Sequence, residues 1–217
     1  MIQNAYVGLG SNLGDRAGYL VLAVRGMLDA GLDVIRLSSI YETEPVEYEN
    51  QPAFLNMVAE LRGSTLPSPD QTLARLLRIE YALGRTRDVR MGPRTIDLDL
   101  LIFKDHRVDT EFLTLPHPRI ASRKFVLVPL NELVPSLVHP VLGKPISVLL
   151  AETKDRSTVV RWPQNAQTGK ERANEYGLCA FLWLWYNARH LLARPLHFQT
   201  FRFPGNSIVH KSWCKES

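Results

Sequence analysis

The chain predicts an α+β domain over residues 1–162, followed by a tail of different composition over residues 163–217. Hydrophobic residues recur with helical spacing in some segments and alternate with period two in others, which indicates both helices and strands. These segments do not follow the regular strand–helix–strand spacing of a parallel sheet, so we expect an antiparallel or mixed sheet. All four tryptophans and both cysteines fall beyond residue 161, which marks the change of composition.

The predicted elements follow these periods along the chain. Strands are expected at Ala5–Leu9, Val34–Tyr41, Phe54–Leu61 and Thr95–Phe103, with a short piece near Val108, and helices at Leu13–Ala30, Pro69–Leu83 and Phe125–Leu133. Ser11 or Asn12 is a suitable N-cap for the first helix, with Asp15 in its first turn. The second helix should end near Gly84, where its apolar period stops.

Glycines near the N-terminus do not form a known nucleotide-binding loop. Gly8, Gly10 and Gly14 have the spacing GxGxxxG, which misses the dinucleotide fingerprint because its third glycine would fall at Leu13. No Lys-Ser or Lys-Thr pair follows, which excludes a P-loop. We assign these glycines a structural role, so nucleotide binding has to come from arginines and aspartates.

The charge of the chain is unevenly distributed. Residues 1–164 hold 19 basic and 19 acidic side chains, so the whole formal charge of +4 belongs to the remaining residues. This distribution argues against a nucleic-acid footprint spread over the domain. The first cysteine is Cys179, so the domain needs no disulfide, and no signal-type segment opens the chain. We therefore expect a cytoplasmic protein without a transmembrane segment.

The most informative segment is Gly92–Phe103, in which two aspartates alternate with aliphatic residues. On a strand, Asp97 and Asp99 point to one face, and Ile96, Leu98 and Leu100 point to the other. The two carboxylates would lie roughly 7 Å apart, well placed to flank one or two hard cations. Magnesium carrying a polyphosphate would relieve their repulsion. The alternative is a solvated edge strand with two incidental acids.

An arginine-rich run precedes this strand. It holds Arg75, Arg78, Arg85, Arg87, Arg90 and Arg94, against only Glu80 and Asp88. The part after Gly84 lacks an apolar period and is expected to be an exposed loop. Guanidinium groups bind phosphate through paired charge-assisted hydrogen bonds, and arginines beside a metal-binding carboxylate pair are typical of phosphoryl transfer. The alternative is a solvated charged face.

These residues together resemble the signature of the 6-hydroxymethyl-7,8-dihydropterin pyrophosphokinases of folate biosynthesis. The signature positions are Arg90, Gly92, Pro93, Arg94, Asp97 and Asp99. Three further blocks are similar to the family in the same order, at the N-terminal AYVGLGSNLGDR, at Ser38–Val58 and at Leu113–Leu133. Two positions depart from some members, which carry aromatic residues where Met91 and Pro118 stand here, so the detailed adenine contacts do not carry over.

The resemblance implies a fold, a reaction and a set of site residues. It implies a ferredoxin-like core with long active-site loops and the ATP-dependent transfer of pyrophosphate to the pterin, with release of AMP, by a monomer that binds only small molecules and no nucleic acid. It assigns catalysis to Arg85, Arg87, Arg94, Asp97 and Asp99, the last two also as ligands of two Mg²⁺ ions. It assigns ATP binding to Glu80, Arg85, Arg87, Arg90, Arg94, His117 and Arg123, and pterin binding to Thr43, Pro45, Val46, Phe54, Asn56 and Phe125.

The chemistry of these residues agrees with a pterin pocket. A flat heterocycle with polar edges needs ring faces and an amide, which Phe54, Phe125 and Asn56 would supply. Each residue also has an ordinary interpretation: the phenylalanines as core, Asn56 as a turn cap, and His117 as an exposed loop residue.

Two other functions remain open from the sequence. A nucleic-acid-binding module would need exposed basic and aromatic strands, and no RNP1-type motif is present. A relative that only binds ligands is disfavoured by the intact Asp97, Asp99, Arg94 and His117.

The resemblance stops near Trp162. The tail contains nine consecutive apolar residues, Leu178–Tyr186, half the length that spans a bilayer. This segment is interpreted as a docked helix, an interfacial anchor, a partner-binding element, or a frame-shifted or read-through extension.

Overall fold

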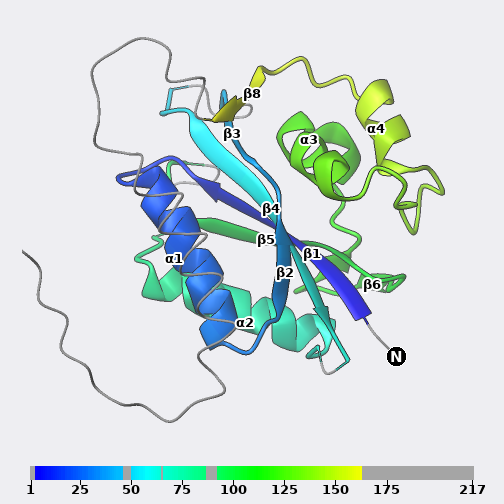
Figure 1. The fold of residues 1–217 in the computed structure, drawn as a ribbon, viewed down its shortest axis with the longest axis horizontal. Helices are drawn as coiled ribbons and strands as arrows, with labels where there is room; N and C mark the ends of the chain where they lie inside the picture. Colours follow the sequence, from blue (N-terminus) through cyan, green and yellow to red (C-terminus); the bar gives the residue numbers. More distant parts are fainter. Residues whose placement is uncertain (1–2, 46–49, 65, 87–91, 163–217) are drawn as a thin grey trace, which may run out of the picture. The chain divides into compact units, whose positions relative to one another are not determined.

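The computed structural model describes residues 3–45, 50–64, 66–86 and 92–162. These residues form a mostly antiparallel α+β fold, as the sequence predicts (Figure 1). The predictions for Val46, Arg87, Arg90 and Met91, and for the tail of residues 163–217, lie outside the described residues.

The central sheet is built around β4 (Phe54–Gly63). Its strand order is β5-β1-β4-β3-β8, and β2 also pairs with β4. Every pairing in this sheet is antiparallel. The other strands are β1 (Gln3–Ser11), β2 (Val34–Leu37), β3 (Ile40–Thr43), β5 (Asp97–Phe103) and β8 (Val159–Trp162).

The order of the strands gives the ferredoxin-like arrangement that the resemblance implies. Helix α1 (Arg16–Asp29) follows β1, and helix α2 (Pro69–Ala82) follows β4. The chain then returns to place β5 beside β1, at the edge opposite β3. This is the split βαβ pattern, to which β8 is added as an extra edge strand.

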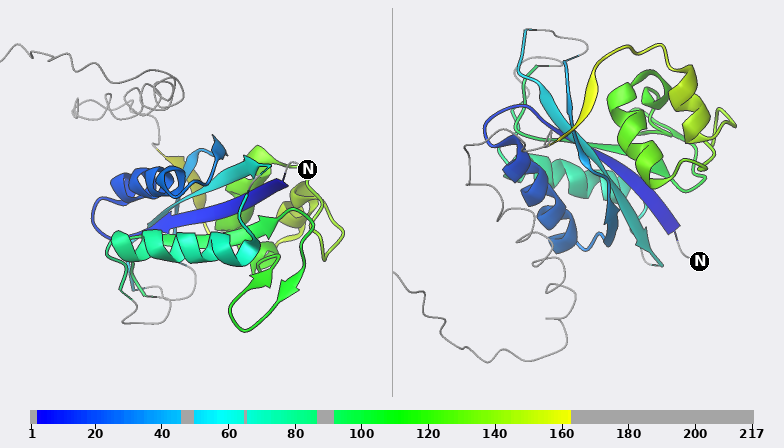
Figure 2. Two further views of the ribbon diagram at one scale, coloured as in Figure 1. Left: turned by 90° about the horizontal axis from the view of Figure 1, so that it is seen from below. Right: turned by 45° about the horizontal axis from the view of Figure 1, so that its top comes forward.

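Helices cover both faces of the sheet. Figure 1 shows α1 and α2 on one side of the strands and, on the other, α3 (Lys124–Leu133) with α4 (Ile146–Glu152). A small hairpin of β6 (Val108–Asp109) and β7 (Thr114–Leu115) follows β5 and is visible in Figure 2. None of the described helices has the length and apolarity needed to cross a membrane.

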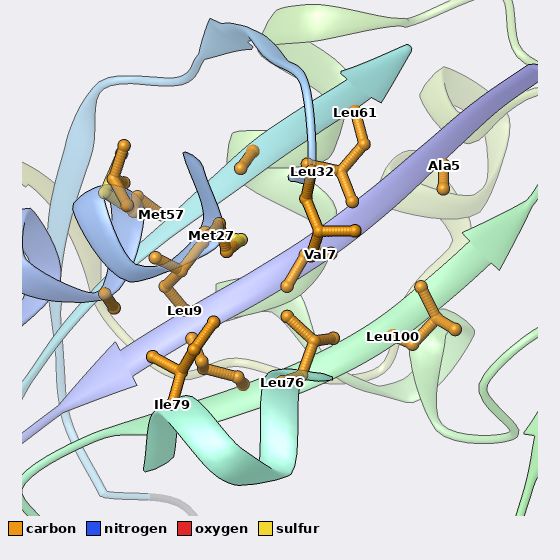
Figure 3. Close-up of a cluster of buried hydrophobic side chains, with 14 of the residues drawn as sticks. Ala5, Val7, Leu9, Met27, Leu32, Met57, Leu61, Leu76, Ile79 and Leu100 are labelled. Atoms are coloured by element: carbon orange, nitrogen blue, oxygen red, sulfur yellow. The ribbon is translucent and has the colours of Figure 1, made fainter. Parts of the chain in front are cut away.

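The main hydrophobic core lies between the sheet and helices α1 and α2. Alternate residues of β1 point into it, and Val7 and Leu9 pack there with Met27 of α1 and Leu76 of α2 (Figure 3). All four side chains are at most 2% exposed. The alternate apolar residues of β1 and the apolar faces of α1 and α2 therefore pack in one core.

A second core lies on the opposite face, under α3 and α4. Tyr6 and Val58 of the sheet pack there with Leu127 of α3 and Leu149 of α4. The register between β1 and β5 shifts beside Tyr6, as expected of a β-bulge, and Leu101 joins this second core. This core covers only part of the face, because the positions that follow Tyr6 on the same side of β1 are Gly8 and Gly10.

Several predicted boundaries are wrong, including both ends of the first strand, which spans Gln3–Ser11 instead of Ala5–Leu9. The strand expected at Val34–Tyr41 is two strands, because the Ser38 hydroxyl accepts the hydrogen bond of the Val58 N–H at 2.9 Å. The first helix begins at Arg16, and its N-cap is Asp15, whose carboxylate accepts from the Gly18 N–H at 2.9 Å. The strand expected from Thr95 begins at Asp97.

Four short elements were not predicted. These are β7, α4, β8 and a 3-10 helix at Ile120–Ser122, which span two, seven, four and three residues. Elements this short carry too few periods to be distinguished from loops.

Candidate active site

A cleft of about 890 Å³ opens on the face of the sheet that carries α3. Its floor is made where β1 pairs with β4 and β5, with Gly10 opposite both Asn56 and Asp97, and Gly8 opposite Asp99. A methyl group on Gly10 would lie 2.8 Å from the side-chain oxygen of Asn56. Glycine is therefore needed here for close approach, which confirms its structural role.

Asp97 and Asp99 lie on the same face of β5, as predicted. Both are partly exposed and line the cleft, whereas Leu98 and Leu100 are buried and belong to the core. The strand β5 does lie at an edge of the sheet, but the alternative of two incidental acids is disfavoured because Asp97 pairs with two arginines and Asp99 lies near a third.

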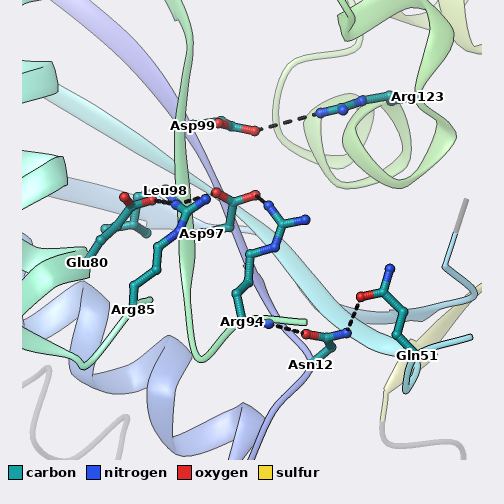
Figure 4. Close-up of polar contacts among 9 residues, drawn as sticks. All are labelled: Asn12, Gln51, Glu80, Arg85, Arg94, Asp97, Leu98, Asp99 and Arg123. Carbon is teal, nitrogen blue, oxygen red and sulfur yellow. Dashed lines mark hydrogen bonds and ion pairs between the residues drawn. The ribbon is translucent and has the colours of Figure 1, made fainter. Parts of the chain in front are cut away.

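Asp97 holds two arginines of the run that precedes β5. One carboxylate oxygen lies 2.6 Å from Nη1 of Arg85, and the other lies 2.7 Å from Nη1 of Arg94 (Figure 4). The three side chains are 23%, 13% and 14% exposed, so the pairs are partly shielded from water. Such charge-assisted hydrogen bonds are stronger than neutral ones.

Glu80 stands behind this group and is only 2% exposed. Its carboxylate accepts a hydrogen bond from the Leu98 N–H at 2.7 Å and pairs with Arg85. Glu80 therefore ties α2 to β5 and holds Arg85 toward Asp97. The structure places Glu80 in the wall of the cleft, where it contacts Arg85.

Asp99 is in a different electrostatic environment from Asp97. The Arg123 guanidinium lies near it, with Nη1 3.8 Å from the Asp99 Oδ2. Burial and the neighbouring charge of Asp97 raise the pKa of Asp99 from 3.8 to about 6. A carboxylate with this much uncompensated charge favours a nearby cation.

His117 enters the cleft as a neutral imidazole. Burial and the charges of Arg123 and Arg119 lower its pKa to about 4. Its backbone N–H donates to the Leu101 carbonyl at 2.8 Å, and Nδ1 accepts from the Arg119 N–H at 3.3 Å. The acceptor role of Nδ1 assigns the proton to Nε2, which is then a neutral hydrogen-bond donor.

The predicted pterin residues that the structure describes belong to the same cleft. Thr43, Pro45, Phe54, Asn56 and Phe125 all line it. The Asn56 amide donates to the Thr43 hydroxyl at 2.7 Å, which fixes its orientation. Neither phenylalanine is fully buried, so both present ring surface that a core interpretation would not require.

Each phenylalanine also has an arginine over its ring. The guanidinium carbon of Arg94 lies 5.6 Å from the centre of Phe54, and that of Arg123 lies 5.4 Å from the centre of Phe125. Arg94 also pairs with Asp97, and Arg123 also lies near Asp99, so these cation–π contacts link the two phenylalanines to the carboxylate pair.

Asn12 and Gln51 belong to the site but were not predicted there. The Asn12 side chain accepts from the Arg94 N–H at 2.8 Å and donates to Gln51 at 3.0 Å and to the Pro52 carbonyl at 3.2 Å (Figure 4). Asn12 thus joins three segments that are far apart in the sequence. The Gln-Pro pair was part of the resemblance, but Asn12 was interpreted as a helix cap, and this interpretation is wrong.

The carboxylate pair fits a magnesium site of the type shared with a phosphate substrate. Mg²⁺ prefers hard oxygen ligands and commonly takes one or two carboxylates, with phosphates and water completing its shell. Within the described residues no group of three or more metal-ligating side chains occurs, so among these residues Asp97 and Asp99 are the two that would ligate the ion. The pair would hold the ion mainly when the polyphosphate is present.

Comparison with known proteins decides the family. The sequence model described as 7,8-dihydro-6-hydroxymethylpterin-pyrophosphokinase (HPPK) matches residues 6–135. The chain belongs to this family. Among curated HPPK relatives, the pyrophosphokinase of Bacillus subtilis is 51% identical over 130 residues, covering 59% of this chain and 77% of the relative. That of Aquifex aeolicus is 38% identical over 141 residues, covering 65% and 86%.

Solved structures agree on the fold. The wild-type HPPK-DHPS of Plasmodium falciparum with pteroate superposes with a TM-score of 0.56 at 18% identity, covering 70% of this chain. The present chain spans 42% of that larger protein. At this identity the likeness supports the HPPK fold alone.

Proposed function

We propose that this chain is a 2-amino-4-hydroxy-6-hydroxymethyldihydropteridine pyrophosphokinase that uses ATP and Mg²⁺. It transfers pyrophosphate from ATP to the hydroxymethyl group of 6-hydroxymethyl-7,8-dihydropterin and releases AMP, in folate biosynthesis. Family membership supports the reaction. The single observation that carries the assignment of residues is the cleft, which joins a carboxylate–arginine group to an aromatic and amide-lined end.

The proposed roles follow from the contacts in the cleft. Arg85 and Arg94 now share the charge of Asp97, and the phosphates of ATP would compete for the same guanidinium groups. Bound Mg²⁺ would neutralise charge on the transferring phosphates, with Asp97 and Asp99 as its protein ligands. Glu80 would act on ATP through Arg85, which it holds.

His117 and Arg123 also line the cleft and are proposed to bind phosphate oxygens. A neutral His117 suits this role as a donor from Nε2. Arg87 and Arg90 are proposed to contribute further positive charge from the segment between Thr86 and Gly92.

The pterin is proposed to bind against Phe54 and Phe125, with Asn56 and Thr43 reading its polar edge and Pro45 and Val46 completing the wall. Stacking and a fixed amide would orient the hydroxymethyl group toward the phosphates. We also propose that the protein is a monomer that acts on two small molecules. We also propose a cytoplasmic location, supported by a domain without cysteine.

The test is formation of AMP. Purified protein is incubated with ATP and Mg²⁺, with and without 6-hydroxymethyl-7,8-dihydropterin, and the nucleotides are separated by chromatography. We expect AMP only when the pterin is present, and no AMP from Asp97→Asn. Release of ADP, or AMP that does not depend on the pterin, would exclude the proposed reaction.

A further inference from the structure

The start of α3 carries two residues of the site but lacks a cap of its own. Arg123 occupies the N-cap position with extended backbone angles, and its side chain makes no capping hydrogen bond. Arginine side chains only donate, so they cannot accept from the first N–H groups of a helix. The Arg123 guanidinium instead lies over Phe125 and near Asp99.

The missing acceptor is supplied by Asp155, which lies 20 residues beyond the segment matched by the family model. One carboxylate oxygen of Asp155 accepts from the Lys124 N–H at 2.7 Å. The other accepts from the Ser157 N–H at 2.8 Å. A carboxylate at this end of a helix is also stabilised by the helix dipole.

The segment that carries Asp155 is itself anchored at both ends. The Lys124 ammonium donates back to the Ser157 carbonyl at 3.0 Å. Immediately afterwards, β8 pairs with β3, with Val159 opposite Thr43. Asp155 thus holds the peptide between Arg123 and Phe125 against a segment that is fixed to the sheet.

Although burial opposes ionisation, hydrogen bonds from Ser157 and the Lys124 N–H lower the pKa of Asp155 below its ordinary value. The carboxylate is therefore ionised at neutral pH, the form that accepts both hydrogen bonds.

We propose that Asp155 is a positioning residue for pyrophosphoryl transfer, which acts by fixing Arg123 and Phe125 through the Lys124 N–H. The inference rests on the proposed function of the cleft. It extends the site to a residue outside the sequence motif. Such a residue can matter for catalysis because a shift of about 1 Å in a positioning group can cost about 100-fold in rate.

The test compares Asp155→Ala with a matched control, Glu152→Ala. Glu152 is a nearby carboxylate, 52% exposed, that pairs with Lys144 on the surface at 2.6 Å. We expect Asp155→Ala to lower kcat by about 10-fold or more, and Glu152→Ala to leave kcat within about twofold. Circular dichroism and a thermal melt establish that both variants are folded at the assay temperature.

Two further measurements separate positioning from general stability. In an Arg123→Ala background, the added Asp155→Ala change should lower kcat by a clearly smaller factor than in the wild type, because the part of its effect that passes through Arg123 is already lost. Hydrogen exchange, read without substrate, should be faster at the Lys124 amide in Asp155→Ala and unchanged in Glu152→Ala. The proposal is overturned if Asp155→Ala lowers kcat by the same factor in the wild-type and Arg123→Ala backgrounds. It is also overturned if hydrogen exchange at the Lys124 amide is unchanged in Asp155→Ala.

If Asp155→Ala does not fold, Asp155→Asn replaces it. Its single oxygen has to serve both the Lys124 and Ser157 N–H groups, so kcat should still fall by about threefold or more. A wild-type kcat in either folded variant overturns the inference while leaving the proposed function intact. An inactive wild-type chain would instead reject the proposed function.

Discussion

The two aspartates of β5 should respond in opposite ways to neutralisation. Asp97→Asn should destabilise the fold, whereas Asp99→Asn should stabilise it at neutral pH, although each change should lower turnover by about 100-fold or more. The difference arises because Asp97 pairs closely with Arg85 and Arg94, at 2.6 and 2.7 Å. Arg123 lies further from Asp99, at 3.8 Å, and compensates its charge less.

The magnitudes follow from these contacts. Hydrogen bonds to charged groups contribute about 1.5–3 kcal/mol each, so losing the two charged pairs of Asp97 should cost about 2–4 kcal/mol after partial solvent screening. For Asp99, a pKa raised from 3.8 to about 6 corresponds to about 3 kcal/mol at neutral pH. Because 36% of that side chain is exposed, we expect solvent screening to leave about 1 kcal/mol.

The pH dependence of stability is a second test of whether Asp99→Asn stabilises the fold. A raised pKa means that the folded state binds the proton more tightly, so the stability due to Asp99 is present below pH 3.8 and lost as pH rises through about 6. The gain from Asp99→Asn should therefore appear between these values and persist above them.

Urea unfolding without Mg²⁺ between pH 4 and 8 measures both effects, and AMP release measures turnover. Destabilisation by Asp99→Asn comparable to that of Asp97→Asn would refute this account of the carboxylate pair.

Three further predictions concern ligands and the tail. Phe54→Ala and Asn56→Ala should each weaken pterin binding by about 1–3 kcal/mol with little change for ATP, and Arg87→Ala should chiefly lower turnover with ATP; calorimetric titrations showing the reverse would reject the pocket. Mg²⁺ affinity, titrated in the presence of a nonhydrolysable ATP analogue, should decrease as pH falls through about 6, because Asp99 must lose its proton to bind metal; a flat profile contradicts this. A chain ending at Gln164 keeps β8 and should retain kcat within about threefold, since every assigned residue precedes it; loss of turnover in a folded product would show that the tail contributes.

The carboxylate pair could be predicted from the sequence because its information is local. Alternation on one strand decides which face Asp97 and Asp99 share, and the structure confirms it. The main helices and strands were also predictable, since each spans several hydrophobic periods. The ends of these elements were harder to predict. The N-cap of α1, for example, depends on which side chain reaches the Gly18 N–H.

The residues that support the site could not be predicted in this way. Asn12 contacts segments about 40 and 82 residues away, and Asp155 caps a helix from 31 residues further along the chain. Neither contact leaves a periodic signal, because it depends on how the sheet order brings distant loops together. The resemblance to the family supplied most of the groups proposed to touch the substrates, whereas the structure identifies the groups that hold them.

The central claim is that the cleft transfers the two terminal phosphates of ATP together. The most direct measurement uses ATP labelled in the β-phosphate, with Mg²⁺ and 6-hydroxymethyl-7,8-dihydropterin, and follows the label by chromatography. The account predicts that the β label appears in the pterin product, that a label in the α-phosphate stays in AMP, and that Asp97→Asn abolishes both. A β label that remains with the nucleotide as ADP would contradict it.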